Sequence, residues 1–395
     1  MRRSRAAPGV GTPLAVDRPM ASPRNPSAAR FVACACAFSF GVSTARAEPP
    51  LMRERSAKAA VSTESDDGRV SLSLGGFLQA RAQREVALGG RDAEDAAAET
   101  APIVSLPRMR FYAFGHVHED TIRYRLMMGA SGVGGTVQVL DAYLEKRFAH
   151  ALHLRAGVFK IPVYRAWIES ARLMSSVERA YATTAFLPGR EGALMASGEL
   201  AGEEYQYAVA LVNGAAAGAT SAEPAGAARV VWNPMGRVIE GEIDFDDQPA
   251  TLSIGANALV NRRVVQAPAA VSAPGLQGVE DALGVEVSLR ARGFDLSGEA
   301  MVRDRRRDDG LRTRSFGAYV RADQYVASIA SSFGGRVSLL AGDDAGTPDR
   351  RDYELDYGFY PGRHDLKLNV EVGYVDYVRA DVRAVEGAAQ VQVAF

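Results

Sequence analysis

The chain has almost no cysteine, few lysines and no long hydrophobic run. Its two cysteines are Cys34 and Cys36, so disulfides cannot hold the rest of the chain together. No run of 18 or more apolar residues occurs, which excludes a transmembrane helix. The formal net charge of -1 argues against a general nucleic-acid-binding protein, because such a protein would be strongly basic.

The first 47 residues have the pattern of a secretory signal peptide. A short apolar run, residues 31–42, follows an arginine, and the small residues Ala45 and Ala47 form an A-x-A cleavage site. We expect residues 1–47 to be removed on export, with Met20 as an alternative start of translation.

The remaining chain is acidic overall and takes its positive charge almost entirely from arginine. Removing the seven arginines and one aspartate of residues 1–47 leaves 39 basic and 46 acidic side chains, a net charge of -7. Only four of the 46 basic residues of the whole chain are lysines. Binding of oxyanions would therefore depend on arginine, whose guanidinium pairs with two oxygens at once and stays protonated.

Apolar and polar residues alternate along most of the chain from Val70 onward, and this period of two predicts β-strands. Many alternating segments have about the 9–11 residues that a tilted membrane strand needs. We count seventeen candidates, or sixteen if the two within 227–246 are one strand and a turn. The candidates are 70–83, 107–118, 121–131, 137–148, 151–161, 191–200, 204–213, 227–235, 237–246, 250–261, 281–292, 294–305, 313–323, 334–341, 352–361, 363–378 and 386–395.

Two all-β architectures fit this pattern: a large soluble sandwich and a transmembrane barrel. Arginines occur in pairs two residues apart, as at Arg108 and Arg110, so each pair shares one face of its strand. On a lipid-facing surface each would cost roughly 2–4 kcal/mol, so in a barrel the pairs must face the lumen. The signal peptide, the absence of cysteine after it and the aromatic strand ends favour a transmembrane antiparallel β-barrel over residues 70–395. Residues 48–69 lack periodicity and are predicted to be a flexible periplasmic N-terminal extension.

Five stretches of sequence occur in an order typical of one protein family. They are "VLDAYLEKRFAHALHLRAGVFKIPV" (139–163), "VERAYATTAFLPGREGALMASGEL" (177–200), "YQYAVALVNG" (205–214), "GFYPGRHDLKLNVEVGY" (358–374) and the terminal "VQVAF". Together they resemble the phosphate-selective porins of the O and P type, which are bacterial outer-membrane channels.

This resemblance implies an all-β barrel of about sixteen strands, with a long, partly helical loop at 163–190 folded into the lumen. It implies a homotrimer in the bacterial outer membrane, in contact with lipid and lipopolysaccharide, that passes small inorganic anions such as phosphate. Phe395 resembles the assembly signal that the barrel-assembly machinery reads. The resemblance implies no catalysis, cofactor, metal or nucleic-acid partner.

The arginines of the inward loop and of the strands are the candidate anion-binding residues. On the loop, Arg179 could instead pair with Glu178 or Glu169, and Arg190 with Glu191, which would only attach the loop to the wall. The constriction candidates are Lys160, Arg165, Arg172, Arg179 and Arg190, and the candidates on the pore wall are Arg108, Arg110, Arg123, Arg125 and Arg155.

Three other functions remain open. The net charge of -7 is compatible with a weakly selective general porin, and a non-conducting structural barrel would share the same strand pattern. An enzyme would need a nucleophile, a base and an orienting group within reach of one another. His116 and His118 lie two residues apart without a set of further ligands, so they are better explained as polar residues at a strand end.

Overall fold

The structure of the chain is a computed structural model. It describes residues 59–89, 101–118, 120–132, 136–213, 224–266, 276–342 and 349–395. The chain divides into two units, residues 1–49 and 50–395, and all described residues belong to the second. The predicted signal peptide and residues 48–58 of the predicted extension lie outside the described residues.

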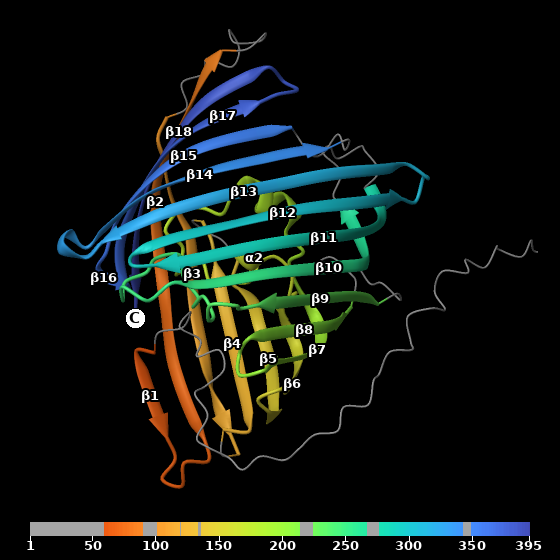
Figure 1. Cartoon of the computed structure of the whole chain (residues 1–395), viewed down its shortest axis with the longest axis vertical. Helices are drawn as coiled ribbons and strands as arrows, with labels where there is room; N and C mark the ends of the chain where they lie inside the picture. Colours follow the sequence, from red (N-terminus) through yellow and green to blue (C-terminus); the bar gives the residue numbers. More distant parts are fainter. Residues whose placement is uncertain are drawn as a thin grey trace, which may run out of the picture. The chain divides into compact units, whose positions relative to one another are not determined.

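Within the described residues, sixteen antiparallel strands close into a barrel (Figure 1). Neighbours along the chain pair with one another, and the last strand, β18, pairs with β2 to close the ring. The barrel strands are β2 (Ser71–Gly89), β3 (Ile103–Val117), β4 (Ile122–Ala130), β5 (Gln138–Ala149), β6 (Leu152–Lys160), β7 (Arg190–Leu200), β8 (Tyr205–Val212), β9 (Ala225–Trp232), β10 (Thr251–Gln266), β11 (Leu276–Ala291), β12 (Phe294–Arg307), β13 (Arg312–Val326), β14 (Ser331–Gly342), β15 (Arg350–Phe359), β17 (Leu366–Tyr377) and β18 (Val382–Ala394).

Smaller elements lie in the connections. A 3-10 helix, η2 (Ala327–Ile329), joins β13 to β14, and the short strand β16 (Pro361–His364) lies between β15 and β17. The predicted strand at 237–246 is wrong, because residues 233–250 contain no strand and instead fold inward between β9 and β10. The apolar residues of this segment, such as Val238 and Ile243, are buried inside the barrel rather than on one face of a strand. The alternative count of sixteen strands is therefore confirmed.

The two faces of the barrel wall have opposite character. On β18, Gln390 and Gln392 point inward and are 1% and 0% exposed, whereas Val391 and Val393 point outward and are each 46% exposed. The same holds around the ring, where outward residues such as Leu355 and Leu283 are exposed and apolar. This is the reverse of a soluble protein, since the apolar face meets the surroundings. No helix among the described residues is long and apolar enough to span a membrane.

The seam between β18 and β2 is held by side chains as well as by the backbone. Inside the barrel, Gln79 Nε2 donates to Gln392 Oε1 at 2.8 Å. At the end of the seam, the backbone N–H of Phe395 donates to the Gly76 carbonyl at 2.9 Å, and the Gly76 N–H donates to the Phe395 carbonyl at 2.8 Å. The last residue of the chain is therefore part of the closed ring, so no strand edge is left open there.

Part of the segment predicted as a flexible extension forms a strand. β1 (Val61–Glu64) turns back at Gly68, which has a positive φ of 67°, and pairs with residues 71–74 of β2. The pairing with β18 ends at Phe77, so the first residues of β2 have an unpaired edge on that side. β1 covers this edge and satisfies its backbone groups.

The loop between β6 and β7, residues 161–189, folds into the barrel as the family resemblance implies, and we call it the inward loop. It contains the short helices α2 (Arg165–Ile168) and α3 (Tyr181–Phe186), which Figure 1 shows within the ring of strands. Its apolar side chains pack against the inner wall. Each such fully buried side chain contributes on the order of 1.5–3 kcal/mol to holding the loop in place. The main cluster includes Tyr164, Trp167, Ala182 and Phe186 of the loop with Phe159, Met195, Leu259, Met301 and Leu340 of the wall.

Candidate functional site

A cavity of about 400 Å³ lies inside the barrel, between the inward loop and the inner wall formed mainly by β3 to β8. Its walls come from strands that follow one another in sequence, so their inward side chains face the same space. At about 30 Å³ per water molecule, this volume holds on the order of a dozen waters. The cavity therefore suits small hydrated solutes rather than large ones.

The lining of the cavity is positively charged, although the chain as a whole is acidic. Eight basic side chains line it against four acidic ones, and two of the basic ones, Arg108 and Arg229, pair with Glu178 and Glu286 behind the lining. Positive charge near the path of an ion lowers the energy of an anion and raises that of a cation. The basic residues are Arg108, Arg110, Arg125, Arg155, Lys160, Arg179, Arg190 and Arg229, and the acidic ones are Asp141, Glu145, Glu199 and Glu240.

Three of these cations surround one indole ring. Lys160, Arg179 and Arg190 lie 5.0, 5.8 and 5.5 Å from the ring centre of Trp167, which is 8% exposed. They come from the end of β6, from the inward loop and from the start of β7. The negative face of the ring partly offsets their mutual repulsion. Trp167 thus allows three like charges to gather on one side of the cavity.

Lys160 also fixes the inward loop. Its ammonium group donates to the carbonyl oxygens of Trp167, Ile168 and Glu169 at 2.8, 3.1 and 2.9 Å, at the end of α2. These three bonds match the three N–H groups of a lysine, so Lys160 acts on a passing anion through its charge rather than through a free donor.

Arg179 faces the cavity without a carboxylate partner among the described residues. Its Nε and one terminal nitrogen donate to the carbonyl oxygens of Ala166 and Glu169 at 2.6 and 2.7 Å. Burial and the nearby charge of Arg108 lower the pKa of Arg179 to about 10, so it remains protonated at neutral pH. The ion pairs with Glu178 and Glu169 that the sequence left open do not form.

Arg110 is the second cavity arginine with no carboxylate within 4 Å in the part of the chain that is described. One terminal nitrogen donates to the carbonyl oxygens of Met109 and Ala130 at 3.1 and 3.2 Å. The charges near it are mainly those of cations, foremost Arg108 and Arg190, and Asp141, which itself binds Arg190, offsets them only in part. Its charge is therefore not cancelled locally.

Other cavity arginines are paired with acids across the wall. Arg190 binds Asp141 at 2.7 Å, and Arg125 lies 3.7 Å from the same carboxylate. Arg155 binds Glu145 at 2.6 Å and stacks over Tyr143. The local pair of Arg190 with Glu191, the alternative suggested by sequence proximity, is absent. Arg190 still lines the cavity, but its charge is largely neutralised.

Glu178 of the inward loop holds two arginines of the wall. It forms a close ion pair with Arg108 and lies 3.4 Å from Arg81. Burial alone would raise the pKa of the Glu178 carboxyl, but the charges of Arg108 and Arg81 outweigh it and lower the pKa below its ordinary value. Arg81 was not among the residues singled out from the sequence. In the sequence it lies between Gln79 and Gln83 on the polar face of an alternating strand, without a second arginine two residues away, so no arginine pair marked it.

Three of the predicted arginines do not line the cavity. Arg165 lies 3.8 Å from Glu169 within the loop, Arg172 pairs with Asp365 at 2.8 Å, and Arg123 pairs with Asp120 at 2.8 Å near a turn. Arg165 and Arg172 attach the loop to its surroundings, and Arg123 braces the end of the wall.

A second segment, residues 233–250, enters the barrel and meets the inward loop. The other connections at this end have six residues or fewer, whereas this one has eighteen. Glu242 accepts hydrogen bonds from the backbone N–H of Ser175 at 2.7 Å and from its hydroxyl at 3.2 Å. Gly241, with a positive φ of 108° that favours glycine, donates its N–H to the Glu169 carboxylate. The two segments thus form one body inside the barrel.

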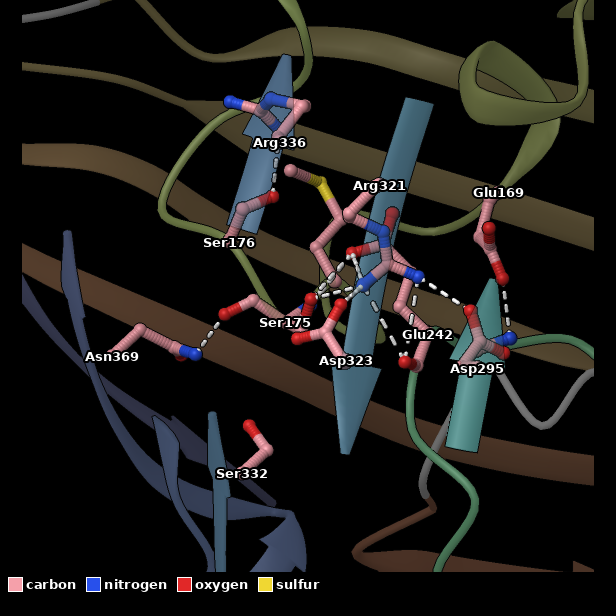
Figure 2. Close-up of polar contacts among 12 residues, drawn as sticks. Glu169, Ser175, Ser176, Glu242, Asp295, Arg321, Asp323, Ser332, Arg336 and Asn369 are labelled. Carbon is pink, nitrogen blue, oxygen red and sulfur yellow. Dashed lines mark hydrogen bonds and ion pairs between the residues drawn. The ribbon is translucent and has the colours of Figure 1, made fainter. Parts of the chain in front are cut away.

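Arg321 of β13 is the centre of this contact (Figure 2). It donates to Asp295 at 2.7 Å, forms close contacts with Asp323 and the Ser175 hydroxyl, and lies 3.5 Å from the Glu242 carboxylate. Arg336 of β14 similarly donates to the Ser176 hydroxyl at 2.9 Å. The inner face of β12 to β14 therefore carries paired charges here, whereas the cavity is lined mainly by β3 to β8.

Comparison with known proteins adds evidence on the fold. No protein-family model matches the sequence, and no curated protein sequence matches it significantly. Among solved structures, an anion-selective porin from Comamonas acidovorans is similar, with a TM-score of 0.58 and 13% identity over 82% of this chain and 100% of that one. The chain has the fold of a bacterial outer-membrane porin.

Two further porin-fold structures support this assignment. The OmpF porin of Salmonella typhi has a TM-score of 0.56 and 10% identity, over 84% of this chain and 99% of that one. The outer-membrane channel DcaP of Acinetobacter baumannii has a TM-score of 0.54 and 11% identity, over 84% and 99%. Because identities are this low, the likeness concerns the porin fold alone.

Proposed function

We propose that the chain is an outer-membrane porin whose arginine-lined cavity passes small anions by diffusion. The observation that carries this proposal is that Arg110 and Arg179 line the cavity without a carboxylate partner among the described residues, inside a barrel whose outer face is apolar. The similar porin from Comamonas acidovorans is described as anion-selective, which is consistent with the proposal. Several moderate sites in series favour conduction over a single deep well.

Within this proposal the cavity residues divide into two groups. Arg110 and Arg179, which have no carboxylate partner in the described residues, contact the anion directly with their remaining N–H groups. Phosphate is the preferred anion on this view, because a guanidinium pairs with two of its oxygens at once. The charges of Lys160, Arg190 and the wall arginines Arg108, Arg125 and Arg155 supply a weaker field along the path.

The location and assembly of the protein follow from the same proposal. The exposed apolar residues of the wall face lipid, residues 1–47 direct export, and residues 48–69 lie in the periplasm. The porin OmpT of Vibrio cholerae, which has a TM-score of 0.53 and 9% identity over 83% of this chain, is described in a trimer form. We infer a homotrimer for this chain on that basis.

A weakly selective porin is the second candidate. Asp141 and Glu145 lie in the cavity wall and neutralise Arg190 and Arg155, and residues 48–395 carry a net charge of -7. Acidic groups near the entrances would then attract cations and reduce the preference for anions.

Recording from the purified protein in planar bilayers distinguishes these functions. Under a gradient of KCl, we expect an ohmic current whose reversal potential is shifted from zero toward the equilibrium potential of chloride. Millimolar phosphate should reduce the chloride current if phosphate binds in the cavity. A reversal potential near zero supports the weakly selective porin, whereas a folded, inserted protein without any current refutes the channel function.

A further inference from the structure

Three potential metal ligands meet where two neighbouring hairpin turns lie side by side. His150 lies in the turn between β5 and β6, Glu199 lies near the end of β7, and Glu203 lies in the turn between β7 and β8. Their ligand atoms all lie within 4.8 Å of one another. The backbone N–H of Glu199 donates to the His150 carbonyl at 3.2 Å, which fixes the two turns relative to each other.

The arrangement of His150 and Glu199 suits a shared ion. His150 Nε2 and Glu199 Oε2 are 3.3 Å apart, but no hydrogen bond joins them. Two ligands of a tetrahedral metal with bonds of about 2.0 Å lie roughly 3.3 Å from each other. No hydrogen bond in the described residues engages Nδ1 of His150 either, so nothing there requires the proton to sit on Nε2.

Glu199 supplies a second, independent indication. The residue is 5% exposed, and its Oε1 accepts hydrogen bonds from Gln206 at 2.9 Å and Arg237 at 2.8 Å. Its Oε2 is buried and accepts no hydrogen bond within the described residues. An unsatisfied buried carboxylate oxygen is costly. Oε2 points toward His150, where the carboxylate of Glu203 also lies.

We propose that His150, Glu199 and Glu203 bind a divalent transition-metal ion, with Zn²⁺ as the best fit. One imidazole nitrogen and two carboxylate oxygens are a ligand set that zinc accepts, with a water molecule in the fourth position. Calcium and magnesium prefer oxygen ligands throughout, so the imidazole disfavours them. Neither His116 nor His118, the histidines that the sequence brings to attention, belongs to this site.

The position of the site gives it a role in the barrel. Glu199 also lines the cavity, and Arg237 belongs to the inward segment 233–250. A bound ion would join two turns of the wall and add positive charge at the edge of the cavity. This inference does not depend on the channel function, because metal binding is measured directly.

Isothermal titration with ZnCl₂ of the purified mature chain, which lacks Cys34 and Cys36, tests the proposal in detergent. We expect one Zn²⁺ per chain for the wild type, and at least about tenfold weaker binding for His150→Ala and for Glu203→Gln. Glu203 lies in a turn, so the isosteric substitution Glu203→Gln should leave the barrel intact. Heat-modifiable migration on a denaturing gel checks that the barrel is folded.

His116→Ala is the matched control. Nε2 of His116 lies 3.9 Å from Glu64 and its Nδ1 lies 3.9 Å from Asp120, but its ring is hydrogen-bonded to Ser71 and near the Gly68 carbonyl. This variant should bind Zn²⁺ as the wild type does. Equal binding by all variants, no saturable binding by the wild type, or equal affinity for Ca²⁺ and Zn²⁺ would each overturn the proposal.

Discussion

Neutralising Arg110 should reduce the preference of the channel for anions without disturbing the wall. Arg110 lines the cavity, and among the described residues it has no carboxylate within 4 Å. In Arg110→Gln, the amide can still donate to a neighbouring carbonyl. The change therefore removes one charge and little else.

The expected size follows from Coulomb's law. An ion passing about 6 Å from the guanidinium in water interacts with it by about 0.7 kcal/mol. The anion loses this energy and the cation gains it, so the anion-to-cation permeability ratio should fall about tenfold without salt. Screening over a Debye length of about 10 Å at 0.1 M salt reduces this change to about threefold.

Reversing the charge separates electrostatics from structural damage. Arg110→Glu should change the logarithm of the permeability ratio twice as much as Arg110→Gln, which is about tenfold at 0.1 M KCl. At 1 M KCl, where the Debye length is about 3 Å, the glutamine variant should differ from the wild type by less than about 1.5-fold. The measurement is the reversal potential of single channels under a KCl gradient at both concentrations.

Arg306 provides the control, because it is exposed and pairs with Asp281 at 2.6 Å outside the cavity. Arg306→Gln should leave the reversal potential unchanged. The reasoning fails if Arg110→Gln and Arg306→Gln shift the permeability ratio equally. It also fails if the effect of Arg110→Glu does not exceed that of Arg110→Gln.

Three further predictions concern the inward loop and the seam. Glu242→Gln should weaken the contact with Ser175 and raise single-channel conductance or its noise, because the loop and residues 233–250 then move apart. Burial would raise the pKa of Glu242, but Arg321 and the Ser175 N–H outweigh it and lower the pKa. The ionised Glu242 should therefore stabilise the folded barrel fully above about pH 4.5, and this stabilisation should be lost as the pH falls through the lowered pKa. Thermal unfolding between pH 3 and 7 measures this loss. Deleting Phe395 should reduce assembly into the outer membrane, measured by heat-modifiable migration, because two backbone hydrogen bonds to Gly76 and the contact with Phe111 are lost.

Each of these predictions has a clear contrary result. Unchanged conductance in Glu242→Gln would mean that the loop is held by its apolar contacts alone. Stability that rises on acidification below pH 4.5 would contradict the lowered pKa of Glu242. Phe395→Trp, which keeps a terminal aromatic, serves as the control for the deletion, and normal insertion of the truncated chain would exclude a role of Phe395 in assembly.

Much of the wall could be predicted from the sequence because its pattern is local. In a strand, successive side chains point to opposite faces, so alternation alone placed Gln390 and Gln392 inside and Val391 and Val393 outside. The same rule placed Arg108 and Arg110 on the inner face. It failed at 237–246, where buried residues alternate without forming a strand.

The candidate site could be predicted only in part. The family resemblance implied that the loop at 163–190 enters the lumen, and the constriction was predicted to contain Lys160, Arg165, Arg172, Arg179 and Arg190. The sequence could not show that three of these residues surround Trp167, nor that Arg165 and Arg172 lie elsewhere. Those arrangements depend on how the loop crosses the barrel, which no local pattern encodes.

The sequence by itself determined most of the strands and their two faces, because both depend on a period of two within about ten residues. Only the tertiary structure decided which charges remain uncancelled. Arg108 pairs with Glu178, 70 positions away, and Arg190 pairs with Asp141, 49 positions away. An ion pair forms only when the charged nitrogen and oxygen atoms come within about 4 Å of each other. The curvature of the barrel and the path of the inward loop set those distances.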